Sequence, residues 1–322
     1  MGAISLKLKG LLLILLLSSN WVFANPVCTP AKDKIIIYQP WASHANLTSA
    51  QLNSIGKTLN NSGYTHLLLQ WNRYGEHSYT SDHQSYWIHD ISNKKNKIIE
   101  GLYADPQFFS ALKLSDAELD SYLSKLRKKS FDEAKYLSLR TTHRIRGWYL
   151  PEEIDDLNWR SETRQRILSN HFKILVSALR KLHPDTPVYA STFFGGHTTP
   201  QDYANFLNKI HLETGIIWMV QDGQGVFRSP RPNTLRYLSA VNKTLPSNAW
   251  LGLLENFTEL NQTSENRFCP ASTTEIKERQ KLWCAATGRE PDVYFSLNQL
   301  NNQLLGHQNS KCTTRRGHIA PN

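Results

Sequence analysis

The sequence alternates short runs of β-branched and aromatic residues with longer amphipathic stretches. The short runs number eight, at residues 35–38, 66–70, 98–103, 145–150, 188–192, 216–220, 250–254 and 293–297. They are largely apolar rather than alternately apolar and polar, which is typical of parallel strands covered on both faces. Eight repeated strand and helix units predict an α/β fold, a (β/α)8 TIM barrel.

The stretches between these runs carry helix signals. We expect helices from Thr48, after Ser115, and at residues 131–143, 160–183, 200–212 and 273–286. Thr48 and Gln51 have the spacing of a capping box, and Pro151 is expected to close the fourth strand. An open doubly wound sheet is the alternative, but it usually carries a glycine-rich phosphate loop after its first strand, which residues 38–41 do not resemble.

The chain is 322 residues long and 40% hydrophobic, which suits one large core. Residues 1–24 contain Lys7 and Lys9, an apolar block and a terminal Ala24, the pattern of a cleaved signal peptide. We therefore expect a single barrel domain over residues 25–322, located in the periplasm or secreted. No later stretch approaches the ~20 apolar residues of a membrane span.

All four cysteines follow the predicted cleavage site, and an even number in an oxidising compartment predicts disulfides. Three pairings are possible. We expect Cys269 with Cys284, which closes a short loop, and Cys28 with Cys312, which ties the chain ends together. A zinc site is disfavoured, because no two cysteines have C-x2-C spacing.

The formal net charge is +10, yet the basic residues are scattered over the helical stretches. We interpret them as a solvated surface and expect no nucleic-acid partner. Lys311, Arg315 and Arg316 form a basic C-terminal tail. The sequence leaves the oligomeric state open.

The carboxyl ends of barrel strands meet at one face, where active sites of this fold lie. Candidate residues there are the carboxylates Glu152, Glu153, Asp222 and Glu255, the amides Gln70, Gln221 and Asn256, and the aromatics Trp41, Trp71, Tyr103, Phe193 and Phe194. Carboxylates and amides bond sugar hydroxyls while aromatic rings stack on a sugar's apolar face. This mixture predicts an oligosaccharide or polysaccharide site.

Two alternatives stay open at this face. Trp41 and Trp71 either line the site or pack under a loop, whereas Trp148, Trp218 and Trp250 fall inside strands and are expected in the core.

Glycoside hydrolysis needs two carboxyl groups that flank the scissile bond. Glu153 and Glu255 follow the fourth and seventh strands, which face each other across a barrel mouth. We expect Glu153 to be the general acid/base and Glu255 the nucleophile or second carboxylate, with retention favoured. Asp222 is a rival partner or part of a plain Asp-Gly turn, and Glu255 could instead be a structural residue bonded to Arg or Lys.

Three motifs carry a family resemblance. Residues 147–155 (GWYLPEEID), 220–226 (VQDGQGV) and 191–196 (STFFGG) resemble the glycosidase-like TIM-barrel proteins of bacteria classed under a domain of unknown function. The likeness runs from about residue 35 to residue 297. It implies a barrel related to retaining glycosidases and an acidic site residue at Glu153 rather than Glu152. The family's Gln-Asp-Gly motif carries over onto Gln221, Asp222 and Gly223.

These patterns predict an exported glycoside hydrolase that acts on a bacterial polysaccharide through two carboxylates. The alternatives are a non-catalytic sugar-binding barrel serving polysaccharide assembly or export, and an extracellular interaction protein with a basic surface. No motif for a serine hydrolase, metalloprotease or nucleotide site occurs, so no cofactor or metal is expected. His77, His83 and His89 are interpreted as part of an exposed loop.

Overall fold

A computed structural model describes residues 28–41, 44, 47–79, 97–140, 145–260, 267–300 and 312. Its centre is a closed barrel of eight parallel strands, in the spatial order β1, β2, β5, β7, β8, β9, β10 and β13. These strands are β1 (Ile35–Tyr38), β2 (His66–Leu69), β5 (Lys97–Gly101), β7 (Trp148–Asp155), β8 (Val188–Phe193), β9 (Ile217–Gln221), β10 (Trp250–Glu255) and β13 (Val293–Phe295). The predicted TIM barrel and its eight strands are confirmed.

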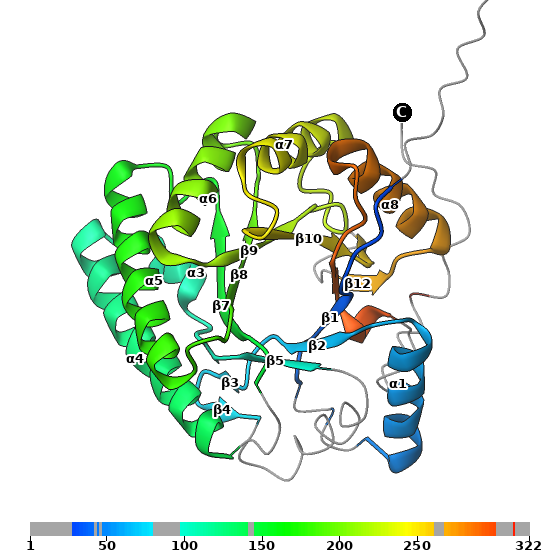
Figure 1. Cartoon of the computed structure of the whole chain (residues 1–322), viewed down its shortest axis with the longest axis horizontal. Coiled ribbons are helices and arrows are strands. Elements are labelled where there is room, and N and C mark those ends of the chain that lie inside the picture. Colours follow the sequence, from blue (N-terminus) through cyan, green and yellow to red (C-terminus); the bar gives the residue numbers. More distant parts are fainter. Residues whose placement is uncertain are drawn as a thin grey trace, which may run out of the picture.

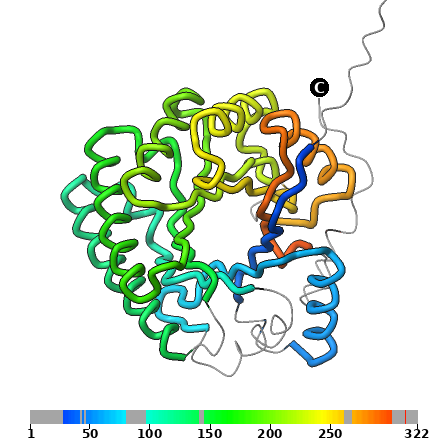
Figure 2. The backbone as a smooth tube through the Cα atoms, in the orientation of Figure 1, coloured from blue at the N-terminus to red at the C-terminus, as the bar shows by residue number. Residues whose placement is uncertain are grey.

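Helices form a layer around the barrel (Figure 1 and Figure 2). They are α1 (Ser49–Asn61), α3 (Phe108–Ala111), α4 (Asp116–Arg140), α5 (Glu162–Leu182), α6 (Pro200–Thr214), α7 (Arg231–Thr244) and α8 (Thr273–Thr287). The predicted capping box of Thr48 and Gln51 begins α1. Small additions near the barrel mouth are β3 (Arg73–Tyr74), β4 (His77–Ser78), β6 (Tyr103–Ala104), β11 (Phe257–Leu260), β12 (Arg267–Pro270) and η2 (Leu297–Gln299).

Two helical expectations were wrong in detail. The stretches expected after Ser115 and at residues 131–143 are one continuous helix, α4, because its buried stripe runs unbroken from Leu119 to Leu137. Helix α7 was missed. The first turn of α7 contains a proline. In a sequence, proline usually indicates the end of a helix, although the first turn of a helix tolerates it.

The fourth strand does not stop at Pro151. β7 continues to Asp155, and its register against β8 shifts between Leu150 and Glu153. A bulge of this kind accommodates proline, which cannot donate a ladder hydrogen bond. The extension places Glu153 within the strand rather than in a following loop.

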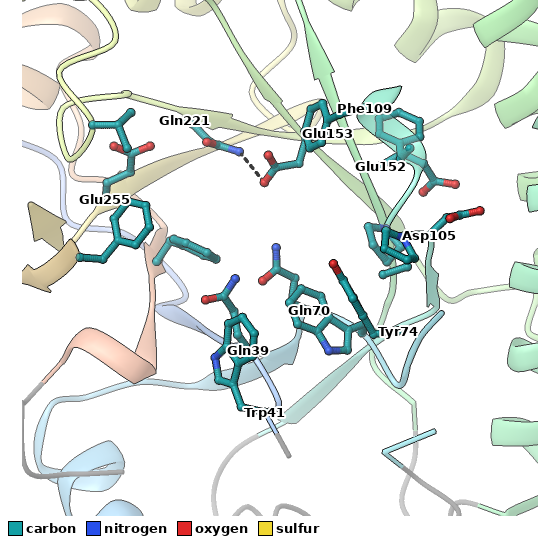
Figure 3. Close-up of a pocket in the computed structure, with 18 of the residues that line it drawn as sticks. Gln39, Trp41, Gln70, Tyr74, Asp105, Phe109, Glu152, Glu153, Gln221 and Glu255 are labelled. Atoms are coloured by element: carbon teal, nitrogen blue, oxygen red, sulfur yellow. Dashed lines mark hydrogen bonds between the residues drawn. The ribbon is translucent and has the colours of Figure 1, made fainter. Parts of the chain in front are cut away.

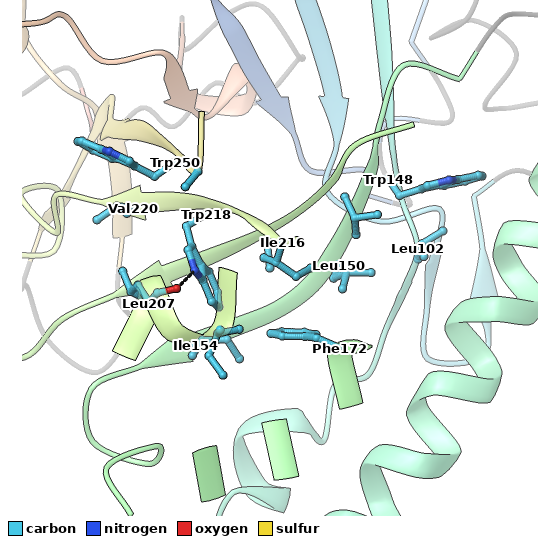
Figure 4. Packing of buried hydrophobic residues seen from close by; sticks show 14 of the residues in the cluster. Leu102, Trp148, Leu150, Ile154, Phe172, Leu207, Ile216, Trp218, Val220 and Trp250 are labelled. Atoms are coloured by element: carbon cyan, nitrogen blue, oxygen red, sulfur yellow. Dashed lines mark hydrogen bonds between the residues drawn. The ribbon is translucent and has the colours of Figure 1, made fainter. Parts of the chain in front are cut away.

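The core has two parts. Strand residues that point outward pack under the helices, and there Trp148, Trp218 and Trp250 are almost fully buried, as predicted (Figure 4). The Trp218 indole Nε1 donates to the Leu207 carbonyl at 2.9 Å. A second cluster fills the barrel interior below the mouth and includes Ile37. The barrel is therefore a packed core with its open space at one end.

The predicted disulfide pairing was wrong. Cys269 on β12 is joined to Cys312, with 5.7 Å between their Cα atoms. Cys269 lies on β12, before α8, whereas Cys284 lies in the last turn of that helix. Cys284 is therefore roughly 16 Å along the helix from its first residue, Thr273, at 1.5 Å of rise per residue.

Cys284 instead neighbours Cys28. The Thr29 N–H donates to the Gly288 carbonyl, which ends α8, and burial together with a hydrogen bond to Cys284 raises the pKa of the Cys28 thiol to about 12.

Some sequence predictions fall outside the described residues. These are the signal peptide at residues 1–24, the basic tail residues Lys311, Arg315 and Arg316, and His83 with His89. Within the described ranges, none of the helices combines the length and apolar character needed to cross a membrane.

Candidate active site

A pocket of about 460 Å³ opens at the carboxyl end of the barrel strands (Figure 3). It lies where loops from strands all round the barrel converge. Of the residues singled out in the sequence, those that line it are Trp41, Gln70, Trp71, Tyr103, Glu152, Glu153, Gln221 and Glu255. Its volume falls in the range of small-molecule binding pockets.

Four sequence candidates do not line this pocket. Asp222 is fully buried beneath it, and Phe193 lies behind Arg228, with the guanidinium 4.0 Å from its ring centroid. Phe194 stacks on Tyr237 in the layer between barrel and helices. Asn256 is buried and donates to the Ser296 carbonyl. Strand residues alternate in direction, so a neighbour of a site residue can point away from the site.

Glu153 lies in the last part of β7, partly open to the pocket and enclosed by protein elsewhere. Its Oε1 accepts a hydrogen bond of 3.3 Å from the Gln221 side chain on β9. Burial raises its pKa, while the positive charge of Arg228 and the Gln221 hydrogen bond oppose that rise. The carboxyl group therefore holds a proton to higher pH than an exposed glutamate, as a general acid must.

Glu255 ends β10, the seventh barrel strand. Its Oε2 accepts the Gly225 N–H at 2.6 Å, and its Oε1 lies 4.0 Å from the Arg228 guanidinium. Burial and the nearby charge of Asp222 raise its pKa to about 7, against the opposing effects of Arg228, the Gly225 N–H and Arg279. In Figure 3 the Gln221 side chain lies between those of Glu255 and Glu153.

Asp222 is a structural neighbour of Glu255. Its Oδ2 accepts the Trp283 indole N–H at 3.0 Å, and its Oδ1 accepts the Gln224 N–H at 3.1 Å. Burial raises its pKa, chiefly against the positive charge of Arg279. With both oxygens bonded below the pocket, Asp222 is placed to orient the following loop and to act on Glu255 through its charge.

The VQDGQGV motif is explained by that loop. Gly223 adopts a positive φ of 63°, which favours glycine. The Gln224 side chain donates to the Ser229 carbonyl and to Thr234 on α7. At Gly225 an added Cβ would meet Glu255 Oε2 and the Phe257 carbonyl oxygen at 2.8 Å each. Only glycine lets this backbone N–H approach the carboxylate so closely.

The neighbouring GWYLPEEID and STFFGG motifs are joined by Asp156, which follows β7. Its carboxylate accepts the backbone N–H groups of Gly195, Gly196, His197 and Thr198 at 2.7 to 3.3 Å. Four charge-assisted hydrogen bonds fix the loop after β8 against the end of β7. Asp156 carries no signal of this role in the sequence, because its partners are identified only once the strands are paired.

Arg228 is a site residue that the sequence analysis missed. It lies in the loop after β9, lines the pocket, and its charge favours the ionised forms of both Glu153 and Glu255. Its Nη1 is buried with no hydrogen-bond partner among the described residues. A lone arginine in a loop carries no sequence signal, and only its approach to Glu255 and its effect on the pKa of both carboxyl groups identify it.

The mouth of the pocket is rimmed by aromatic side chains. Trp41 packs edge-on against Trp71, whose ring also contacts Tyr74. Other aromatic side chains in the lining are Tyr103, Phe108, Phe109, Phe257, Phe268 and Phe295. Trp41, Tyr74, Phe109 and Phe268 are among the exposed large hydrophobic residues, so their rings are accessible to a ligand.

In the described part of the chain, no three His, Cys, Asp or Glu side chains lie close enough together to bind a metal ion.

Comparison with known proteins places this architecture in a family. Residues 35–302 match the family described as "Domain of unknown function (DUF4434)". The chain belongs to this family. A curated relative of this DUF4434 chain is the "Uncharacterized protein YbcH" of Escherichia coli K12, at 36% identity over 241 residues, covering 73% of this chain and 77% of the relative.

Solved structures share the fold at low sequence identity. A protein from Bacteroides thetaiotaomicron assigned as an alpha-L-fucosidase matches with a TM-score of 0.65 and 13% identity over 97% of this chain and 98% of that one. The spore cortex-lytic enzyme SleL of Bacillus cereus has a TM-score of 0.56 and 8% identity, with 87% and 75% covered. An intracellular xylanase of Thermoanaerobacterium saccharolyticum has a TM-score of 0.52 and 12% identity, with 84% and 87% covered. These likenesses show that the chain shares the TIM-barrel fold of these proteins.

Proposed function

We propose that this DUF4434 protein is a glycoside hydrolase. The observation that carries the proposal is the pair of buried carboxyl groups, Glu153 and Glu255, which reach one aromatic-rimmed pocket from the fourth and seventh barrel strands. Two carboxyl groups that flank one bond are what glycoside hydrolysis requires. The names of the similar structures, which include a xylanase and a cortex-lytic enzyme, support a polymeric glycan as substrate.

Glu153 acts as the general acid/base. Burial raises its pKa, so it holds a proton to higher pH than an exposed glutamate and can donate it to the glycosidic oxygen as the bond breaks. Gln221, which donates to Glu153 Oε1, fixes the direction in which the carboxyl group presents its proton. After the first step, the same carboxylate takes a proton from the incoming water.

Glu255 acts as the nucleophile at the anomeric carbon. The Gly225 N–H holds Oε2, which leaves Oε1 toward Arg228 and the pocket. Its pKa of about 7 means that the ionised form dominates only above neutral pH. Arg228 and substrate binding both favour that ionised form, and the resulting glycosyl-enzyme is hydrolysed with overall retention.

We further propose that the protein is exported and acts on a bacterial polysaccharide. The basis is the N-terminal signal pattern, the Cys269–Cys312 disulfide and the fold shared with a spore cortex-lytic enzyme of Bacillus cereus.

The test is a panel of purified polysaccharides incubated with the mature protein, with release of new reducing ends as readout. We expect release from at least one polymer, and NMR of the first product should show the anomer of the substrate. Sugar binding without any release across the panel would contradict hydrolysis and favour a non-catalytic sugar-binding barrel. Release with the opposite anomer would support the enzyme and contradict the nucleophilic role of Glu255.

A further inference from the structure

The charges that line the pocket are unlike those of the whole chain. The chain carries a formal net charge of +10, with 37 basic and 27 acidic residues. The charged residues in the pocket lining, however, are four carboxylates, Asp105, Glu152, Glu153 and Glu255, and one guanidinium, Arg228. An acidic pocket in a basic protein attracts cations to the site and disfavours anions.

Hydrolysis needs only two of these carboxylates, so Asp105 and Glu152 remain to be explained. Figure 3 shows their carboxyl groups near one another, on the side of the pocket away from Glu255. Both lie close to the Tyr122 hydroxyl: burial, then Asp105, then Glu152 raise the pKa of Tyr122. Asp105 follows β6, is half-buried, and accepts the Gln107 N–H at 2.9 Å.

Glu152 is only 3% exposed, and neither carboxyl oxygen has a hydrogen bond among the described residues. The His171 Nε2 lies 3.4 Å from Oε1, but both ring nitrogens of His171 also lack hydrogen bonds there. A buried carboxylate without hydrogen bonds is rare in a folded protein. Because its oxygens are covered, Glu152 does not bond a ligand directly, and Asp105 is the carboxylate that a ligand can touch.

Aromatic rings complete this side of the pocket. Tyr74, Phe109 and Phe108 line it next to Asp105, and the first two rings are exposed. Lys129 is a nearby cation, but its side chain is half-exposed and its ammonium donates to the Tyr103 hydroxyl at 2.9 Å. Carboxylates beside aromatic faces are the combination that binds an ammonium group, through ion pairing and cation–π attraction.

We propose that this side of the pocket is a subsite for a sugar with a free, protonated amino group, that is, a de-N-acetylated hexosamine unit of the glycan. Asp105 bonds the ammonium directly, Glu152 strengthens the negative potential from behind, and Tyr74 or Phe109 stacks on the ring. The proposal rests on the proposed function for the identity of the pocket, and it names the substrate class.

The test compares pairs of hexosamine oligosaccharides that share length and linkage and differ only in N-acetylation. Binding is measured by calorimetry on a Glu255→Gln background, in which turnover is expected to be lost, at a pH where the amine is protonated. We expect the amine form to bind about tenfold more tightly, since hydrogen bonds to charged groups contribute a factor of this order. Raising the salt concentration should reduce the preference.

Adding Asp105→Asn should abolish the preference, with the thermal midpoint and binding of the N-acetylated form retained. The matched control is Asp185→Asn, an exposed aspartate in the turn between α5 and β8 at the opposite end of the barrel, which should keep the preference. Equal or tighter binding of the N-acetylated form, or a preference that survives Asp105→Asn, would overturn the proposal.

The two proposals fail in different ways. A protein that prefers the amine form yet releases no reducing ends contradicts hydrolysis alone. A protein that hydrolyses glycans without distinguishing the paired oligosaccharides contradicts the amino-sugar subsite alone.

Discussion

At the scale of single residues, Glu255 occupies a buried position in which ionising its carboxyl group is unfavourable. Its pKa is about 7, whereas an exposed or unfolded glutamate titrates near 4.3. Between these values the folded protein binds a proton that the unfolded chain has released. The stabilisation from the neutral side chain is therefore present at low pH and is lost as the pH rises toward 7.

The variant Glu255→Gln should consequently be more stable than the wild type at pH 8. We expect a gain of about 1–3 kcal/mol in the free energy of unfolding, because the amide keeps the shape without the buried charge. Urea unfolding at pH 8 and pH 4.5 measures it, and the gain should shrink at the lower pH. Glu76→Gln, at a side chain 96% exposed, is the control and should change little. A loss of stability at pH 8 would contradict this account of Glu255.

Asp222 should act on Glu255 through its charge. Removing a negative neighbour favours ionisation of Glu255, so Asp222→Asn should lower the Glu255 pKa and move the acid limb of kcat/KM to lower pH. A shift of about one unit is expected for a close buried pair. Carbon NMR titration of the glutamate carboxyl groups gives the same pKa without substrate. An unchanged or upward shift would show that Asp222 does not set this pKa.

At the scale of elements, the loop from Asp222 to Gly225 is built to hold Glu255 at the end of β10. An alanine Cβ at Gly225 would meet the Glu255 carboxylate and the Phe257 carbonyl, both at 2.8 Å. Gly225→Ala should therefore displace the nucleophile.

We expect Gly225→Ala to lower kcat by at least about tenfold, because small misplacements of reacting groups have large effects on rate. Steady-state kinetics on the identified glycan measures it. Gly63→Ala is the control, because Gly63 follows α1 and an added Cβ there meets no atom within 4 Å; its positive φ, which Gly225 does not share, is unfavourable for alanine. It should lose stability and keep kcat. Full activity of Gly225→Ala would show that the close contact is not needed.

The elements differ in how far sequence reveals them. The eight strands could be predicted, because each is buried on both faces and so reads as an apolar run. The extension of β7 past Pro151 could not, since it depends on a bulge in the pairing with β8. Site residues at strand ends, such as Glu153 and Glu255, can be located in the sequence once the eight strands have been identified. Arg228 and Phe268 lie in a loop and a small hairpin, where no periodicity marks a position.

At the scale of the whole molecule, the Cys269–Cys312 bridge ties the chain end to the β11–β12 hairpin. Sequence spacing favoured the wrong partner, because the path of α8 between Cys269 and Cys284 is invisible in a cysteine count. Peptide mapping without reduction should recover Cys269 linked to Cys312, and Cys312→Ser should reduce the free energy of unfolding by about 2–4 kcal/mol. A peptide linking Cys269 to Cys284 would contradict the fold of this region.

The proposed hydrolase depends on Glu153 and Glu255 as its catalytic pair. The decisive measurement is reducing-end release from the identified polysaccharide by wild type, Glu153→Gln and Glu255→Gln, alongside Glu76→Gln as an exposed control. We expect Glu255→Gln to lose all detectable turnover while glycan binding persists. Glu153→Gln should be impaired most on substrates with poor leaving groups, where protonation of the departing oxygen matters most. Release by both variants at the wild-type rate would show that these carboxylates are structural and contradict the account.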